Sequence, residues 1–175
     1  MTKPTIAILL AAVFFLSACE KASSPAPKPQ PAAALPETLM LANAPSDAKP
    51  VEDAKSAAKV GEIVTISGKI GGMMKPFAED RAVFTLVGPG IPSCADTPGD
   101  TCTTPWDYCC ETSEDIAAHA ATINVVDDSG KVIKATLKGV GGMKELSTVT
   151  VVGKVRAIEG ASLVIDAQGI FVATK

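Results

Sequence analysis

The stretch that decides the fold is Val64-Thr65-Ile66-Ser67-Gly68-Lys69-Ile70. Its apolar and polar residues alternate, which is the two-residue period of a strand with one buried face. A second stretch has nearly the same order of residues, Val149-Thr150-Val151-Val152-Gly153-Lys154-Val155. Other short runs rich in β-branched residues predict strands at residues 82–87, 121–126, 132–137, 148–156 and 162–172. Helical periodicity is nearly absent, so the sequence predicts an all-β domain.

Turn signals separate the predicted strands. Asp127-Asp128-Ser129-Gly130 is typical of a hairpin turn, and Glu159-Gly160 joins the last pair of strands in the same way. Five or six short strands joined like this favour a small closed barrel, because closure removes exposed sheet edges. Strand order and glycines at the expected bends resemble the OB-fold over residues 61–174. The helix usual between its third and fourth strands has no room in residues 138–146, which leaves a partly open barrel or a β-sandwich as alternatives.

The first nineteen residues have the order of an export signal. Lys3 precedes an apolar run from Ile6 to Leu16, and the tetrad Leu16-Ser17-Ala18-Cys19 follows. The run is shorter than the roughly 20 apolar residues that span a bilayer. The tetrad resembles the lipobox of bacterial lipoproteins, which implies cleavage before Cys19 and a diacylglycerol thioether, usually with an N-acyl chain, on that cysteine. Two or three acyl chains anchor a protein stably, whereas one binds reversibly.

This resemblance implies a membrane-anchored lipoprotein of the cell envelope, with residues 1–18 as its signal peptide. Glu20 follows the cysteine, where Asp would favour inner-membrane retention in some Gram-negative bacteria, so we expect the outer membrane, facing the periplasm. Residues 19–59 hold seven of the thirteen prolines and predict a lipidated, flexible linker. Within it, Leu35–Ala42 and Val51–Lys59 are candidates for local order. Residues 60–175 are expected to form the domain.

Charge and motifs exclude several functions. Without residues 1–18 the chain keeps 15 basic and 19 acidic residues, a formal charge of −4, because one Lys and no acid are removed from the totals of 16 and 19. With no basic patch and few aromatics, nucleic-acid binding is not expected. The sequence has no Gly-x-Ser-x-Gly, no His-Glu-x-x-His and no phosphate-binding glycine loop with Lys. It therefore predicts no enzyme and no cofactor other than the lipid.

A long cysteine-rich loop, residues 88–112, interrupts the predicted strands. It carries the four cysteines that lipidation leaves over, Cys94, Cys102, Cys109 and Cys110. An even number of cysteines in an exported chain indicates disulfides. A bond between adjacent cysteines would be strained, so Cys94 and Cys102 are each expected to pair with one of Cys109 and Cys110. The sequence leaves both such pairings open.

The same loop contains the only Trp and the only Tyr, in the run Pro105-Trp106-Asp107-Tyr108-Cys109-Cys110-Glu111. This run resembles one in small uncharacterised bacterial lipoproteins, and the resemblance implies no activity. The leading hypothesis is a binding or structural module. Its cross-linked loop would present binding residues to an envelope protein or a glycan, namely Trp106, Asp107, Tyr108 and Glu111.

The alternative hypothesis is a copper- or other metal-binding, or thiol-redox, lipoprotein. Its ligands would be the four loop cysteines and the single His119, with Met73, Met74 and Met143 as soft ligands in two Gly-Gly-Met turns. The cysteine spacing matches no zinc module and contains no Cys-x-x-Cys, which favours disulfides. His119 would end a short helix that begins after Thr112-Ser113-Glu114-Asp115, a place more typical of a capping or surface residue.

Overall fold

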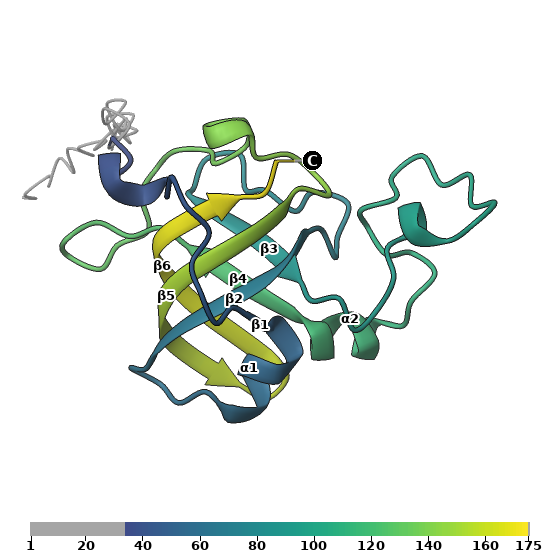
Figure 1. Ribbon diagram of the computed structural model, residues 1–175, viewed down its shortest axis with the longest axis horizontal. Coiled ribbons are helices and arrows are strands. Elements are labelled where there is room, and N and C mark those ends of the chain that lie inside the picture. Colours follow the sequence, from purple (N-terminus) through teal and green to yellow (C-terminus); the bar gives the residue numbers. More distant parts are fainter. Residues whose placement is uncertain (1–33, 175) are drawn as a thin grey trace, which may run out of the picture. The chain divides into compact units, whose positions relative to one another are not determined.

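The computed structural model describes residues 34–174, and its main feature is one six-stranded sheet (Figure 1). The all-β prediction is confirmed. The strands are β1 (Lys49–Pro50), β2 (Ile63–Ile70), β3 (Val83–Val87), β4 (Ala120–Asn124), β5 (Thr148–Glu159) and β6 (Ser162–Val172). The two α-helices are short, α1 (Val51–Ala57) and α2 (Ser113–His119), and 3-10 turns lie at Glu37–Leu39, Cys94–Asp96 and Val140–Gly142. Within residues 34–174, no helix has the length and apolar character needed to cross a bilayer.

The strand pairings form a closed ring. The order β2-β3-β4-β6-β5 returns to its start because β5 also pairs with β2. The β4–β6 pair is parallel and the other pairs of the ring are antiparallel. Only two residue pairs join β2 to β3, whereas seven join β2 to β5. The ring therefore has its fewest paired residues between β2 and β3.

The two similar stretches of sequence lie side by side in this ring. Val64 is opposite Gly153 and Ile66 is opposite Val151, in antiparallel register. Gly68 pairs with Val149 of β5 next to the start of the pairing with β3, and a Cβ there would lie 2.4 Å from the carbonyl oxygen of Val87. Because only glycine allows this approach, Gly68 permits one strand to pair with both neighbours.

Alternating burial along the strands builds the core. In β5 the buried residues follow the two-residue period, Val149, Val151 and Val155. The strands β2, β3, β4 and β6 contribute Ile66, Phe84, Ile123 and Ile165 among others to the same cluster. The β-branched residues that favour strands therefore also fill the space between them.

The described part of the expected linker is packed against the sheet. Leu39 is 2% exposed, and the amide of Leu41 donates to the carbonyl of Ile170 at 2.8 Å. Helix α1 buries Val51 and Ala54. Residues 34–59 thus pack with the folded domain and are not part of a tether, because the two candidates for local order, one apolar segment and one short helix, each bury apolar side chains that fix them. The predicted signal peptide, the lipidation site Cys19 and the rest of residues 19–33 lie outside the described residues.

The strand predicted at residues 132–137 is not formed. Ile133 is buried and its amide donates to Val125 at 3.0 Å, but the pairing amounts to an isolated bridge between Val126 and Val132. The chain then bends away and buries Leu137 and Met143 separately. The single turn at Val140–Gly142, between these two residues, is the only helix-like element in residues 138–146, as the lack of room predicted.

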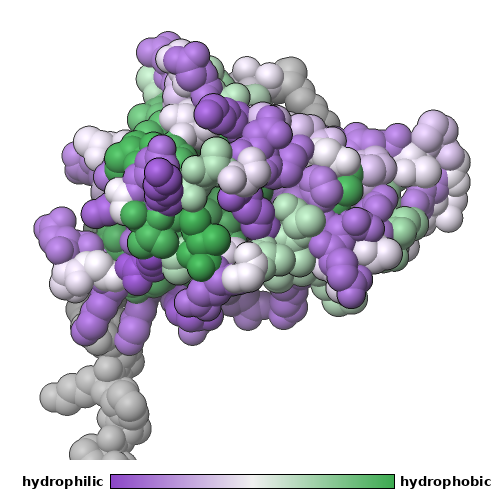
Figure 2. All heavy atoms as spheres, turned by 90° about the horizontal axis from the view of Figure 1, so that it is seen from below, coloured by the Kyte–Doolittle hydropathy of each residue, from purple (hydrophilic) through white to green (hydrophobic). Residues whose placement is uncertain are grey.

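Hydrophobic side chains gather in one area of the face drawn in Figure 2, where hydrophilic residues surround them. Among the described residues, the exposed large hydrophobic side chains are Val60, Ile63, Met73 and Met74. The first two lie just before and at the start of β2, and the methionines follow its end. Exposed apolar residues in such small groups are ordinary in folded proteins.

Candidate binding cleft and cysteine-rich loop

A cleft of about 520 Å³ lies over the outer side of β3 and β4. Three elements border it: the segment of residues 71–74 after β2, helix α2, and the turn between β5 and β6. Its lining consists almost entirely of small and apolar residues with a few hydroxyl groups: Gly72, Met73, Thr85, Ser113, Ile116, Ala117, Ala120, Ala121, Thr122, Glu159, Ala161, Ser162 and Leu163. Glu159 is the only charged lining residue, and none is aromatic.

Helix α2, one wall of the cleft, is fixed at both ends. Thr112 caps its beginning by accepting a hydrogen bond from the amide of Asp115 at 3.1 Å. At the other end the Lys55 ammonium donates to the carbonyls of Ala117 and Ala120, the second at 2.9 Å. A cation at this end is favourable because the last carbonyls of a helix carry partial negative charge. The short helix is therefore held by α1.

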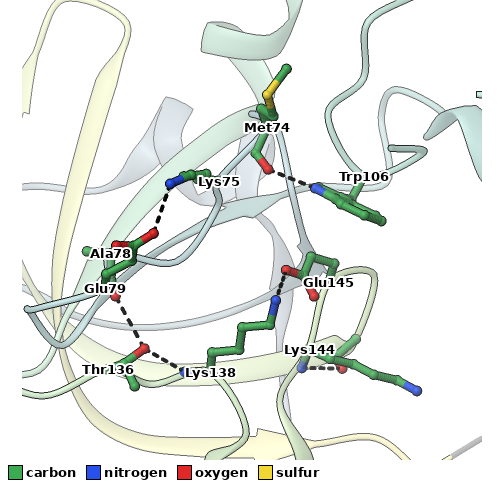
Figure 3. A network of polar contacts seen from close by, with 10 residues as sticks. Met74, Lys75, Ala78, Glu79, Trp106, Thr136, Lys138, Lys144 and Glu145 are labelled. Atoms are coloured by element: carbon green, nitrogen blue, oxygen red, sulfur yellow. Dashed lines mark hydrogen bonds and ion pairs between the residues drawn. The ribbon is translucent and has the colours of Figure 1, made fainter. Parts of the chain in front are cut away.

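The cysteine-rich loop is attached through Trp106 to another wall of the cleft, the segment of residues 71–74. The amide of Gly72 donates to the Trp106 carbonyl at 2.8 Å, and the indole Nε1 donates to the carbonyl of Met74 at 3.1 Å. Figure 3 shows the indole pointing at Met74, with a separate ion pair between Lys138 and Glu145 beside it. The indole N–H thus already donates a hydrogen bond within the protein, and the loop fixes the segment of residues 71–74.

Tyr108 is not presented to solvent, which corrects the prediction for this residue. It is 1% exposed and packs with Val87 and Ile91 in a small second core, against which Ile116 of α2 also rests. Burial raises the pKa of its phenol to about 12. Its φ of 60° is unusual for a residue with a Cβ. The side chain anchors the loop instead of reaching a partner.

The other two predicted binding residues have different surroundings. Asp107 accepts hydrogen bonds from the Thr104 hydroxyl at 2.7 Å and from the Cys109 amide at 3.0 Å. The hydrogen bond from Thr104 is the main reason that the pKa of Asp107 is lowered. Glu111 is half-buried, and its amide donates to the Tyr108 carbonyl at 2.9 Å. Asp107 therefore shapes the turn around the cysteines.

The four loop cysteines are thiols in this structure and lie close together. Sulfur–sulfur distances are 3.5 Å for Cys102 and Cys109, 3.7 Å for Cys94 and Cys109, and 3.9 Å for Cys94 and Cys110. Cys94 is buried, whereas Cys109 and Cys110 are exposed. Hydrogen bonds to Cys102 and Cys94 raise the pKa of Cys109, which keeps it protonated at neutral pH. The expected disulfides stay a prediction, and the four cysteines expected to form them lie near one another.

Two groups within the loop have the composition of a metal site: Cys94, Cys102, Asp107 and Cys109, and Cys94, Asp100 and Cys110. His119 belongs to neither group. Its Nδ1 lies 2.8 Å from the Asp115 carbonyl at the end of α2, where the sequence placed it. Met143 is fully buried in the main core, so the alternative hypothesis loses both His119 and this methionine as ligands.

Glu52 of α1 lies where the loop leaves β3. Its Oε2 is buried without a hydrogen-bond partner among the described residues. A Cβ on Gly88 would lie 1.7 Å from this oxygen, and one on Gly90 would lie 2.7 Å from Nε2 of His119. Glycine at both positions thus lets the chain pass between the carboxylate and the imidazole.

A second cavity, of about 450 Å³, lies on the other side of the loop, between β2 and Ile91. Its charged residues, Lys69 and Asp96, form an ion pair at 2.6 Å. Asp96 also accepts from the Ser93 hydroxyl at 2.7 Å, and with Lys69 this lowers its pKa to about 2. These two charges therefore already neutralise each other.

Comparison with protein-family models, with curated proteins and with solved structures finds no match for this chain. Sequence reasoning found the loop but missed the cleft. The cleft residues are mostly Ala, Gly, Ser and Thr taken from five separate segments, and no local motif marks such a set.

Proposed function

We propose that this chain is a lipoprotein of the cell envelope, anchored through a lipid on Cys19, that binds an extended peptide segment of an envelope protein in the cleft. The binding domain on this proposal is an OB-like barrel. Its support is the ring of pairings, in which the first and fourth long strands (β2, β5) are neighbours and the third and fifth (β4, β6) run parallel. The export signal and lipobox support the location.

The position of the cleft carries the functional proposal. OB-folds bind ligands on the face of their second and third strands, between the loop after the first strand and the loop after the fourth. In this chain those parts are β3, β4, the segment of residues 71–74 and the β5–β6 turn, and all of them line the cleft. A ligand here would also contact α2, which the cysteine-rich loop positions.

The chemistry of the lining favours a peptide over other ligands of such barrels. Nucleic acid requires cationic side chains and stacking platforms, and this lining has neither. A sugar ring would likewise find no aromatic surface. Small side chains let a polypeptide backbone come close, and the hydroxyls of Thr85, Ser113 and Thr122 can bond its amides and carbonyls. Glu159 at the edge favours a basic residue beside the bound segment.

The test fills the cleft with a large side chain placed on helix α2. Ala117 lines it and Ala118 of the same helix is exposed outside it, so Ala117→Trp and Ala118→Trp are a matched pair. Full-length protein in detergent micelles would be screened against a library of extended peptides and an array of glycans. We expect selected peptides that bind the wild type and Ala118→Trp but lose at least tenfold in affinity for Ala117→Trp. Equal binding by both variants, or binding of glycans alone, would refute the proposal.

A further inference from the structure

We infer that the cysteine-rich loop carries two disulfides with one defined connectivity, Cys102 to Cys109 and Cys94 to Cys110. The sequence leaves this pairing and the pairing of Cys94 to Cys109 with Cys102 to Cys110 equally open. The structure separates them by the closest sulfur–sulfur contacts, which form a series of three. Cys102 contacts Cys109, Cys109 contacts Cys94, and Cys94 contacts Cys110.

Only one choice of bonds along this series joins all four sulfurs. Bonds at its two ends use Cys102 with Cys109 (3.5 Å) and Cys94 with Cys110 (3.9 Å). A bond at the middle contact, Cys94 with Cys109 (3.7 Å), would leave Cys102 and Cys110 at opposite ends of the series. No described contact joins those two sulfurs within residues 34–174.

One cysteine of each pair has its amide held by a hydrogen bond. The Cys94 amide donates to the Pro105 carbonyl at 3.1 Å, and the Cys102 amide donates to Asp100 at 2.7 Å. Sulfur atoms in a disulfide are about 2.05 Å apart, so the two pairs must close by roughly 1.5 and 1.9 Å. Rotation of the cysteine side chains covers such distances without moving these amides.

Charge decides between disulfides and a metal, since geometry alone admits both. Thiolates at about 2.3 Å from a tetrahedral zinc are roughly 3.8 Å apart, close to the distances here. Residues 88–112 contain no Lys or Arg and four acids, Asp96, Asp100, Asp107 and Glu111. Three thiolates and a divalent cation, held together with Asp107 that is already counted among these acids, would add a charge of −1 to this acidic loop, whereas two disulfides add none.

Each bridge forms by thiol–disulfide exchange with an exported, disulfide-bearing oxidant. Two S–H bonds of the chain break and one S–S bond forms. The oxidant's S–S bond accepts the two electrons and two protons, so the oxidant leaves as a dithiol. Cys109 and Cys110 are exposed, which gives the oxidant access to one sulfur of each pair.

The experiment counts thiols in full-length protein purified from cell envelopes after acid quenching. Alkylation before and after reduction gives the number of free and bonded cysteines by mass. A variant with serine at all four loop cysteines shows how many of the counted thiols come from Cys19. Wild type should show no free loop thiol, whereas four free thiols or a stoichiometric bound metal ion would overturn the inference.

Two double variants decide the pairing. Cys102→Ser/Cys109→Ser keeps a predicted pair and should have no free loop thiol. Cys94→Ser/Cys109→Ser leaves Cys102 and Cys110, which should stay free or link two molecules. An intramolecular bridge in that variant would overturn the pairing. Fragmentation of wild-type cross-linked peptides between residues 109 and 110 gives the same answer without any variant: Cys94 linked to Cys109 would refute the inference, and Cys94 linked to Cys110 would support it.

Discussion

The packing of residues 34–59 against the sheet can be tested by Leu39→Ala. Leu39 is 2% exposed within the main core, and the change removes three carbon atoms from that site. At about 0.8 kcal/mol for each buried methylene, plus a cavity contribution, we expect a loss of about 3 kcal/mol in the free energy of unfolding. Residues 34–174 are 141 residues (174 − 34 + 1), with an unfolding entropy of roughly 0.3 kcal/mol/K, so the melting temperature should fall by about 10 °C.

Urea denaturation followed by circular dichroism measures this loss, and an unchanged m-value would show that the unfolded surface is the same. Glu37→Ala is the matched control, because Glu37 is exposed in the same 3-10 turn. The control should change the free energy of unfolding by less than about 0.5 kcal/mol. If Leu39→Ala costs less than about 1 kcal/mol, the segment around Leu39 detaches easily and belongs to the linker of residues 19–59 that the sequence alone predicted.

Two further changes test the ring and the loop. Gly153→Ala would place a Cβ 2.6 Å from the carbonyl oxygen of Asp166, a backbone atom that cannot rotate away. Thermal melting should therefore show a loss of about 2 kcal/mol in the free energy of unfolding, and the control Lys154→Ala, at an exposed position, should not show it. Equal melting temperatures for the two variants would contradict the close approach of β5 and β6. Asp96 has its pKa lowered to about 2, so its contribution to stability is complete above about pH 4 and is lost as the pH falls toward 2. Asp96→Asn should therefore flatten the fall in urea midpoint between pH 4 and 2, and an unchanged slope would mean that the Lys69 ion pair is not maintained in solution.

The sequence determined the strands, since their signal is local. Alternation along β2, β5 and β6 fixes which side chains are buried whatever the neighbouring strand is, and the cap at Thr112 fixes the start of α2. It also brought four cysteines into one loop. The strand predicted at residues 132–137 is wrong for the same reason: a local signal shows that apolar residues are buried, but they can be buried singly without a neighbouring strand that completes the pairing.

Only the tertiary structure decided what lies beside what. Whether residues 34–59 pack depends on a groove formed by distant strands, and the burial of Tyr108 depends on Val87 and Ile91. The cleft brings together small residues from five segments, and the sulfur order Cys102–Cys109–Cys94–Cys110 follows from how the loop is held by Trp106 and Pro105. The first three depend on contacts between separate segments of the chain, and the sulfur order depends on how one loop is folded. Composition and spacing carry no information on either.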